Sequence, residues 1–161
     1  MSGRYLLIVW HSRTGSAKSL ASAAFEGAGN HARILRACEV EPRHLLDAGG
    51  YLFCCPENLA SMSGEMKEMF DRNYYPVLMK IAGRPFATII AAGSDGQGAQ
   101  AQIDRIAKGW RLKRVARQMI VDTGAQTEAE IAAPKEIAES QIEMARELGQ
   151  AMGQGIVEGI F

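Results

Sequence analysis

The chain has 161 residues, a length that suits one domain of ordinary size, and we expect residues 1–161 to share a single core. Its 18 lysines and arginines equal its 18 aspartates and glutamates, so the total charge gives no reason to expect nucleic acid or an acidic membrane as a partner. Three cysteines without metal-binding spacing argue against a disulfide framework and a zinc site and favour a cytoplasmic location, and no apolar run approaches the roughly 20 residues of a membrane span.

Five short apolar runs alternate with helical patterns, which predicts an α/β fold with a parallel sheet between helices. The runs are residues 5–10, 33–37, 51–55, 86–92 and 115–121. The first, third and fourth are almost continuously apolar, as strands buried on both faces are, whereas the second and fifth carry arginines and resemble edge strands. This pattern predicts the doubly wound five-stranded order 2-1-3-4-5, in which ligands bind at the carboxyl ends of the strands.

Small or apolar residues recur at helical spacing between these runs, which predicts helices after the first, third, fourth and fifth strands. We expect the last helix to be entered through Pro134 and to bury Ile137, Met144 and Leu148. A glycine-rich tail follows from Met152 to Phe161. It either frays or docks its apolar residues on this chain or a neighbour.

The first strand leads into a loop rich in hydroxyl groups, residues 11–18, before the first helix begins. Backbone N–H groups at such a junction have no intrahelical partner, and the hydroxyls of Ser12, Thr14 and Ser16 can add donors. The loop lacks the features of a Walker loop, a phosphatase cysteine and the paired acids of a phospho-acceptor domain. We therefore interpret it as a site that holds a phosphate without transferring it, the alternative being that one hydroxyl merely caps the helix.

The loop after the third strand, Pro56 to Gly64, mixes polar with apolar side chains. Glu57 and Asn58 offer polar contacts and Leu59 offers apolar area, so this loop could form one wall of a slot. Ser61 or Ser63 can cap the helix that follows.

The loop after the fourth strand, Gly93 to Gly98, contains three glycines in six residues. Glycine permits backbone conformations and close approaches that other residues cannot adopt, as a wall against a flat ligand requires. An ordinary flexible turn is the alternative. Residues 96–101 also match the dinucleotide pattern G-x-G-x-x-A, but the acidic ribose partner of that motif is missing.

The three loops together resemble those of a known family. The resemblance is carried by Ser12-Arg13-Thr14-Gly15-Ser16, by Pro56-Glu57-Asn58 through Met62-Ser63-Gly64 with Lys67, Phe70-Asp71-Arg72 and Tyr74-Tyr75-Pro76, and by Ala92-Gly93-Ser94-Asp95-Gly96. In these residues the chain is similar to the FMN-binding flavodoxin-like proteins, a group that includes NAD(P)H-dependent FMN or quinone reductases and flavodoxins. The likeness spans almost the whole chain and implies one flavodoxin-like FMN-binding domain over residues 1–161.

The same resemblance implies a set of cofactor-binding residues. Those for the FMN phosphate are Ser12, Thr14, Gly15, Ser16 and the amide of Ala17, with Arg13 either adding charge or staying solvated. Those that would flank the flavin ring are Pro56, Glu57, Asn58, Leu59, Gly93, Ser94, Asp95 and Gly96. Ala17 stands where flavodoxins usually have a second threonine, so the phosphate loop has one hydroxyl fewer.

The function implied by the resemblance is that of an oxidoreductase with FMN as cofactor and NADH or NADPH as transient electron donor. Electrons would pass through the flavin N5 to a quinone, a flavin or a similar acceptor, and no dedicated catalytic residue is expected because the flavin supplies the chemistry. Two alternatives stay open. One is a flavodoxin-type electron carrier that docks on a redox partner protein, against which the zero net charge argues; the other is an FMN-free interaction module. A homo-oligomer is compatible with each.

Overall fold

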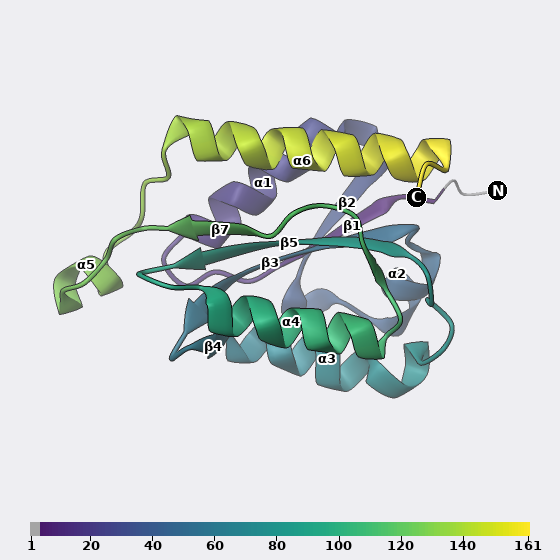
Figure 1. Cartoon of the computed structure of the whole chain (residues 1–161), viewed down its shortest axis with the longest axis horizontal. Coiled ribbons are helices and arrows are strands. Elements are labelled where there is room, and N and C mark those ends of the chain that lie inside the picture. The colour runs from purple at the N-terminus through teal and green to yellow at the C-terminus, as the bar shows by residue number, and fades with distance from the viewer. Residues whose placement is uncertain (1–3) are drawn as a thin grey trace.

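The computed structural model describes residues 4–161 and contains a central sheet with helices on both faces (Figure 1). Its strands are β1 (Leu6–Trp10), β2 (Ala32–Arg36), β3 (Gly50–Asn58), β4 (Ser61–Met62), β5 (Pro85–Ala92), β6 (Lys113–Arg114) and β7 (Met119–Asp122). The order is β2-β1-β3-β5-β6, with β7 parallel to β5 and the short β4 antiparallel to β3. If β6 and β7 are counted as one interrupted strand, the predicted order 2-1-3-4-5 is confirmed.

The helices form two layers around this sheet. Their bounds are α1 (Ser16–Ala28), α2 (Pro42–Asp47), α3 (Gly64–Val77), α4 (Gln97–Gly109), α5 (Glu128–Ala132) and α6 (Glu139–Glu158), and short 3₁₀ turns span Gly29–His31 and Ala37–Glu39. Helices α1 and α6 cover one face, α2, α3 and α4 cover the other, and α5 projects from one end of the molecule (Figure 1). No helix within residues 4–161 is both long and apolar enough to cross a membrane.

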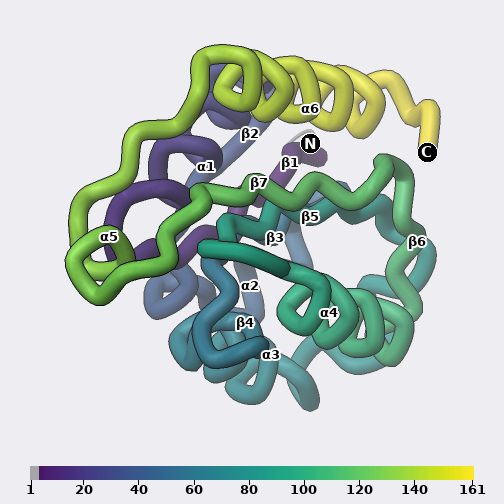
Figure 2. Tube along the Cα trace, turned by 60° about the vertical axis from the view of Figure 1, so that its left-hand side comes forward, coloured from purple at the N-terminus to yellow at the C-terminus, as the bar shows by residue number. Residues whose placement is uncertain are grey.

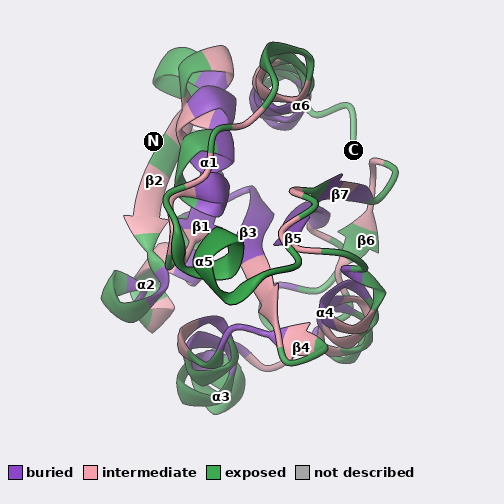
Figure 3. Ribbon diagram, turned by 90° about the vertical axis from the view of Figure 1, so that its left-hand side faces the viewer, coloured by how far each residue is buried: buried purple, intermediate pink, exposed green. Residues whose placement is uncertain are grey.

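Two apolar clusters, one on each face of the sheet, hold the layers together. Alternate side chains of a strand point to opposite faces, so Leu7 and Phe53 belong to the cluster under α3 and α4, whereas Ile8 and Leu52 belong to the one under α1 and α6. The central strands β1, β3 and β5 are almost wholly buried, whereas β2 is half-exposed at the edge (Figure 3). This difference confirms the distinction between central and edge strands that the apolar runs predicted.

The fifth predicted strand differs from the observed one. The predicted range 115–121 contains only β7, residues 115–118 are not strand, and the short β6 lies just before the range; β6 and β7 pair with the amino and carboxyl ends of β5 respectively. The break coincides with Arg114, whose guanidinium donates to the hydroxyl of Thr88 at 2.9 Å and the carbonyl of Ala116 at 3.3 Å, and forms an ion pair with Asp104.

The end of the chain is ordered, because α6 continues to Glu158 and Phe161 folds back against Gly155. Helix α6 begins at Glu139, five residues after Pro134. Of the predicted apolar residues, Ile137 and Leu148 pack partly buried against the cluster under α1 and α6, but the fully buried stripe of α6 is formed by other residues. Met144 is 55% exposed, whereas its neighbour Ala145 is buried. The buried stripe consists mainly of alanine and glycine, so apolar size was a misleading guide to its position.

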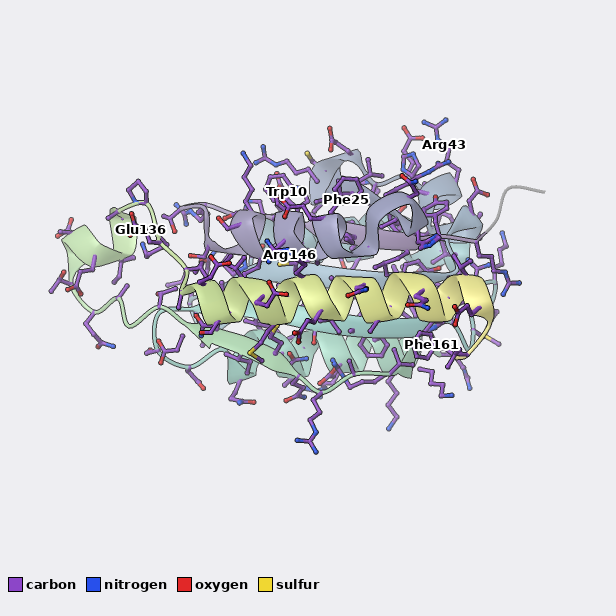
Figure 4. The ribbon with its side chains drawn as sticks, turned by 90° about the horizontal axis from the view of Figure 1, so that it is seen from above. Trp10, Phe25, Arg43, Glu136, Arg146 and Phe161 are labelled. Atoms are coloured by element: carbon purple, nitrogen blue, oxygen red, sulfur yellow. The ribbon has the colours of Figure 1, made fainter. Side chains whose placement is uncertain are left out.

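Small residues allow α6 to lie unusually close to α1. A Cβ atom built on Gly149 would lie 1.9 Å from the carbonyl oxygen of Ala24, and one on Gly27 would lie 1.9 Å from that of Arg146. Figure 4 shows Arg146 between the two helices, where its guanidinium approaches Glu26 of α1 at 3.2 Å. Backbone contact at these glycines therefore sets the separation of the two helices.

Candidate functional site

A cavity of about 460 Å³ opens at the carboxyl ends of the central strands. This is the edge where doubly wound sheets bind ligands, and the volume lies within the range of small-molecule sites. Four segments line the cavity: the β1–α1 loop, the end of β3, the end of β5, and the stretch after β7. The lining residues are Ser12, Arg13, Thr14, Ser16, Ala17, Pro56, Glu57, Asn58, Ala91, Ala92, Gly93, Thr123, Ala125, Ile131, Ala132 and Lys135.

The loop between β1 and α1 presents backbone donors toward this cavity. Gly15 caps α1 with a left-handed backbone (φ 101°), and its N–H donates to the hydroxyl of Ser12 at 3.0 Å. Within residues 4–161, no protein group accepts a hydrogen bond from the N–H of Ser16 or Ala17. The three hydroxyl residues therefore do not cap the helix, which removes the capping alternative and leaves the first-turn amides available to an anion.

The end of β3 continues into a tight hairpin instead of the open loop that the sequence predicted. Strand β3 runs to Asn58, turns through Leu59 and Ala60 with positive φ values of 53° and 60°, and returns as β4. Both the hydroxyl of Ser61 and the N–H of Met62 donate to the side-chain oxygen of Gln102 in α4, at 2.9 and 2.8 Å. The hairpin is thus fixed to α4.

Glu57 joins the hairpin to the glycine-rich loop after β5. One carboxylate oxygen accepts the N–H of Gly96 at 2.9 Å, and the other accepts the N–H of Ala99 at 3.0 Å. The side chain therefore caps the N-terminus of α4, where a negative charge is also favoured by the helix dipole. Glu57 borders the cavity, but its oxygens already have protein partners, so its role is to hold two walls together.

The approach of α4 to the hairpin requires a glycine. A Cβ atom on Gly98 would lie 2.0 Å from the carbonyl oxygen of Ala60, which is far inside van der Waals contact. The glycines after β5 were predicted to permit a close approach, and Gly98 does so toward the protein's own hairpin.

The fourteen predicted binding residues divide into two groups. Nine line the cavity: Ser12, Arg13, Thr14, Ser16, Ala17, Pro56, Glu57, Asn58 and Gly93. The remaining five lie outside its wall: Gly15 shapes the loop, Gly96 is held by Glu57, and Leu59, Ser94 and Asp95 are exposed. Ser63 is the residue before α3, as predicted for a cap, but its hydroxyl makes no capping hydrogen bond.

The fourth wall of the cavity comes from residues 123–135, none of which was among the predicted binding residues. Thr123 and Ala125 follow β7, and Ile131, Ala132 and Lys135 lie in and after α5. The N–H of Lys135 donates to the carbonyl of Thr14 at 3.0 Å, which ties this segment to the β1–α1 loop (Figure 2). Because all parallel strands end at one edge of the sheet, the loop after the fifth strand could have been considered together with the other three.

Three titratable groups near the cavity, His11, Cys54 and Cys55, are not among its lining residues. Burial lowers the pKa of His11, so its imidazole is neutral near pH 7, and Nε2 lies 3.4 Å from a carboxylate oxygen of Glu65. Burial raises the pKa of Cys55 to about 12 and that of Cys54 well above its ordinary value, which keeps both as thiols.

Comparison with known sequence families matches residues 12–126 to the family described as NADPH-dependent FMN reductase. The chain belongs to this family. The match contains the first three walls of the cavity and ends before α5, so the wall formed by residues 131–135 lies beyond it. The predicted resemblance to flavodoxin-like FMN proteins is thereby confirmed. A comparison with curated protein sequences produced no match.

Solved structures share the fold of this chain. A flavodoxin from the domain Archaea has 13% identity and a TM-score of 0.75, covering 94% of this chain and 98% of its own. A flavodoxin, WrbA-like protein from Agrobacterium tumefaciens has 18% identity and a TM-score of 0.75, covering 96% and 98%. The flavodiiron protein from Giardia intestinalis has 18% identity and a TM-score of 0.76, but the match covers 96% of this FMN reductase family member and only 36% of that chain.

Proposed function

We propose that the chain is an FMN-dependent oxidoreductase that takes electrons from NADH or NADPH and passes them to a quinone, a flavin or a similar small acceptor. Residues 1–161 would form one FMN-binding domain. The observation that carries this proposal is a single cavity that combines unpaired first-turn amides at one end with walls of mixed polarity at the other. Such a cavity suits a ligand with an anionic end and a flat apolar end.

The phosphate end of FMN fits the β1–α1 loop. The free amides of Ser16 and Ala17 and the hydroxyl of Thr14 would donate to the phosphate, and the exposed Arg13 adds positive charge beside them. A hydrogen bond to a charged group contributes about 1.5–3 kcal/mol, whereas the helix dipole contributes about 0.3–1 kcal/mol. Several donors together therefore decide the affinity, and the hydroxyl missing at Ala17 lowers it without removing the site.

The ring end fits the walls formed by β3 and β5. Pro56, Asn58 and Gly93 line the cavity and would contact the flavin. The hydrogen bond between the Gly96 N–H and the Glu57 carboxylate holds these two walls together. Leu59, Ser94 and Asp95 would border the open side of the ring. When bound, FMN supplies the redox chemistry itself, so the protein needs only to bind and orient it and to leave one side accessible.

The decisive test is reduction of the FMN-loaded protein without oxygen. We expect NADH or NADPH to bleach the visible flavin absorbance, and a quinone added afterwards to restore it. With both nucleotide and quinone in excess, we expect many turnovers per flavin. Loss of colour with a chemical reductant but with neither nucleotide would refute the reductase and favour an electron carrier. Failure of the protein to quench FMN fluorescence would refute FMN binding altogether.

Removal of one backbone donor should loosen the phosphate loop. In Lys135→Pro the hydrogen bond to the Thr14 carbonyl is lost, and we expect the dissociation constant for FMN to rise about fivefold, since one such bond contributes about 1 kcal/mol. Fluorescence titration measures this change. Lys135→Ala is the matched control and the reference for this factor, because it removes the same cavity-lining side chain, whose Nζ donates to the carbonyls of Ile131 and Ala133, but keeps the N–H. Equal effects of both variants would contradict a role for the Lys135 amide.

A further inference from the structure

The zero net charge of the chain conceals a strong segregation of charge along it. Residues 76–118 contain eight lysines and arginines but two acidic residues, whereas residues 119–161 contain two basic and eight acidic residues. Between Arg105 and Val121 there are six basic residues and no acidic one. The balanced total therefore results from a positive stretch and a negative stretch that cancel.

Much of the positive stretch gathers at the amino edge of the sheet, opposite the FMN cavity. The N–H of Gly83 donates to the carbonyl of Arg111 at 2.7 Å, and the N–H of Lys113 donates to that of Arg84 at 2.9 Å, so the loops before β5 and β6 adjoin. Arg4, Lys80 and Arg84 line one cavity of about 300 Å³ there. We call this surface the basic end: Arg4, Lys80, Arg84, Lys108, Arg111 and Lys113.

The charges of the basic end are not neutralised by ion pairs. Within residues 4–161, none of its six side chains lies within salt-bridge distance of a carboxylate, in contrast to Arg114, which pairs with Asp104. Five of the six are exposed, whereas Arg84 is half-buried and its guanidinium donates to the carbonyls of Leu45, Leu46 and Ala48. Two acidic residues lie nearby: exposed Asp47, between Leu46 and Ala48 whose carbonyls Arg84 contacts, and Glu158 in the last turn of α6, whose carboxylate accepts a hydrogen bond from Gln154.

Apolar side chains project beside these cations. Met79, adjacent to Lys80, is 63% exposed on a turn with a positive φ of 64°. Ile160 is 67% exposed and precedes Phe161, which lines the same cavity as Lys80 (the end of the chain is labelled in Figure 4). The surface therefore combines unpaired cations with protruding apolar groups.

We propose that the basic end docks the protein on a bilayer that contains anionic phospholipid. Lysines and arginines near such a surface are attracted by its negative potential, and exposed apolar side chains enter the boundary between headgroups and acyl chains. Separate protruding side chains suit a fluid interface, which adapts to them, better than a protein partner, which would need matching pockets. A nucleic acid would use the cations but derive no benefit from Met79 or Ile160.

The acidic part of the chain gives this docking an orientation. Helix α5 lies on the side of the molecule away from β6 (Figure 2), and it carries Glu128 and Glu130. Repulsion of this side from an anionic surface directs the FMN cavity toward water. Docking would thus retain the protein at the membrane while its site stays open to solutes, and it does not depend on the proposed reductase activity.

Sedimentation with vesicles tests the proposal on the intact chain. We expect binding to vesicles of equal parts phosphatidylcholine and phosphatidylglycerol, weaker binding as salt rises, and none to phosphatidylcholine alone. The double variant Lys80→Ser with Lys113→Ser should bind about thirtyfold more weakly, from roughly fivefold per cation. Arg36→Ser with Lys67→Ser removes the same charge away from this surface and should retain most of the binding. Equal losses in both variants, or no binding to the anionic vesicles, would overturn the proposal.

A second pair of variants separates a bilayer from other polyanions. Met79→Ser with Ile160→Ser should reduce vesicle binding about tenfold, because partial burial of two apolar side chains is lost. The same variant should leave any binding to a single-stranded DNA oligonucleotide unchanged. If the apolar variant binds vesicles as well as the parent does, or if the oligonucleotide binds more tightly than the vesicles, the surface is a polyanion site and the membrane proposal fails. Circular dichroism shows whether each variant is folded.

Discussion

Replacing Glu57 with alanine should raise the dissociation constant for FMN roughly thirtyfold. The substitution removes the acceptor for the N–H groups of Gly96 and Ala99, which join the hairpin after β3 to the loop after β5. Two charge-assisted hydrogen bonds to a half-exposed carboxylate contribute about 2 kcal/mol together. Without these bonds, the two walls adopt the arrangement that binds FMN in only a fraction of the molecules. The apparent affinity for FMN falls in proportion to that fraction.

Comparison of two flavins distinguishes this effect from damage to the phosphate site. Because Glu57 acts on the ring end, Glu57→Ala should weaken riboflavin, which lacks the phosphate, and FMN by the same factor. Glu57→Gln keeps one carbonyl oxygen as acceptor and should be intermediate. Glu68→Ala, which removes an exposed carboxylate of α3, is the control and should leave both affinities unchanged. A loss confined to FMN would contradict the role assigned to Glu57.

Replacing Gly149 with alanine should destabilise the folded protein by about 3 kcal/mol. The added methyl group would lie 1.9 Å from the carbonyl oxygen of Ala24, so α6 would have to move away from α1 along its length. Overpacking of a close-packed contact commonly costs about 1–3 kcal/mol, and here the obstacle is backbone, which cannot rotate aside as a flexible side chain can. Urea unfolding followed by circular dichroism measures the change.

Gly109→Ala provides the matched control for this prediction. Gly109 is the last residue of α4, and a Cβ atom there would meet no other atom within 4 Å. Alanine should therefore leave stability unchanged or raise it by about 0.5–1 kcal/mol, since glycine loses more backbone entropy on folding. Similar destabilisation by both substitutions would contradict the assignment of the effect to the contact between α1 and α6, since alanine has the higher helix propensity.

Because the charges of this chain are segregated, its net charge is a poor guide to its partners. The net charge of zero led to the expectation that neither an acidic membrane nor a nucleic acid would bind. Electrostatic attraction acts over about 10 Å at moderate ionic strength, so a partner senses the local surface and not the sum. The count of basic residues between 105 and 121 was available from the sequence, but only the fold shows that the loops before β5 and β6 place Arg84, Arg111 and Lys113 together.

The amino-acid sequence by itself determined the sheet and the place of the site. Continuous apolar runs identify strands buried on both faces, and the arginines of residues 33–37 identify an edge; with the second and fifth strands outermost, the doubly wound order 2-1-3-4-5 fits this burial. The hydroxyl-rich residues 12–16 follow the first strand directly, and a parallel sheet leaves no other place for them than its carboxyl edge. These features are local patterns, and local patterns can be recognised without knowing which distant segments meet.

The tertiary structure alone decided how the cavity is held together. In the sequence alone, nothing distinguishes a Glu57 side chain that points into the site from one that binds the protein. Its hydrogen bonds with Gly96 and Ala99 form because the hairpin brings residues about forty positions apart into contact. Likewise, Lys135 meets Thr14 only because α5 crosses the sheet edge after β7. A polar side chain forms its hydrogen bonds with whichever donors packing brings near it, and that selection is made in three dimensions.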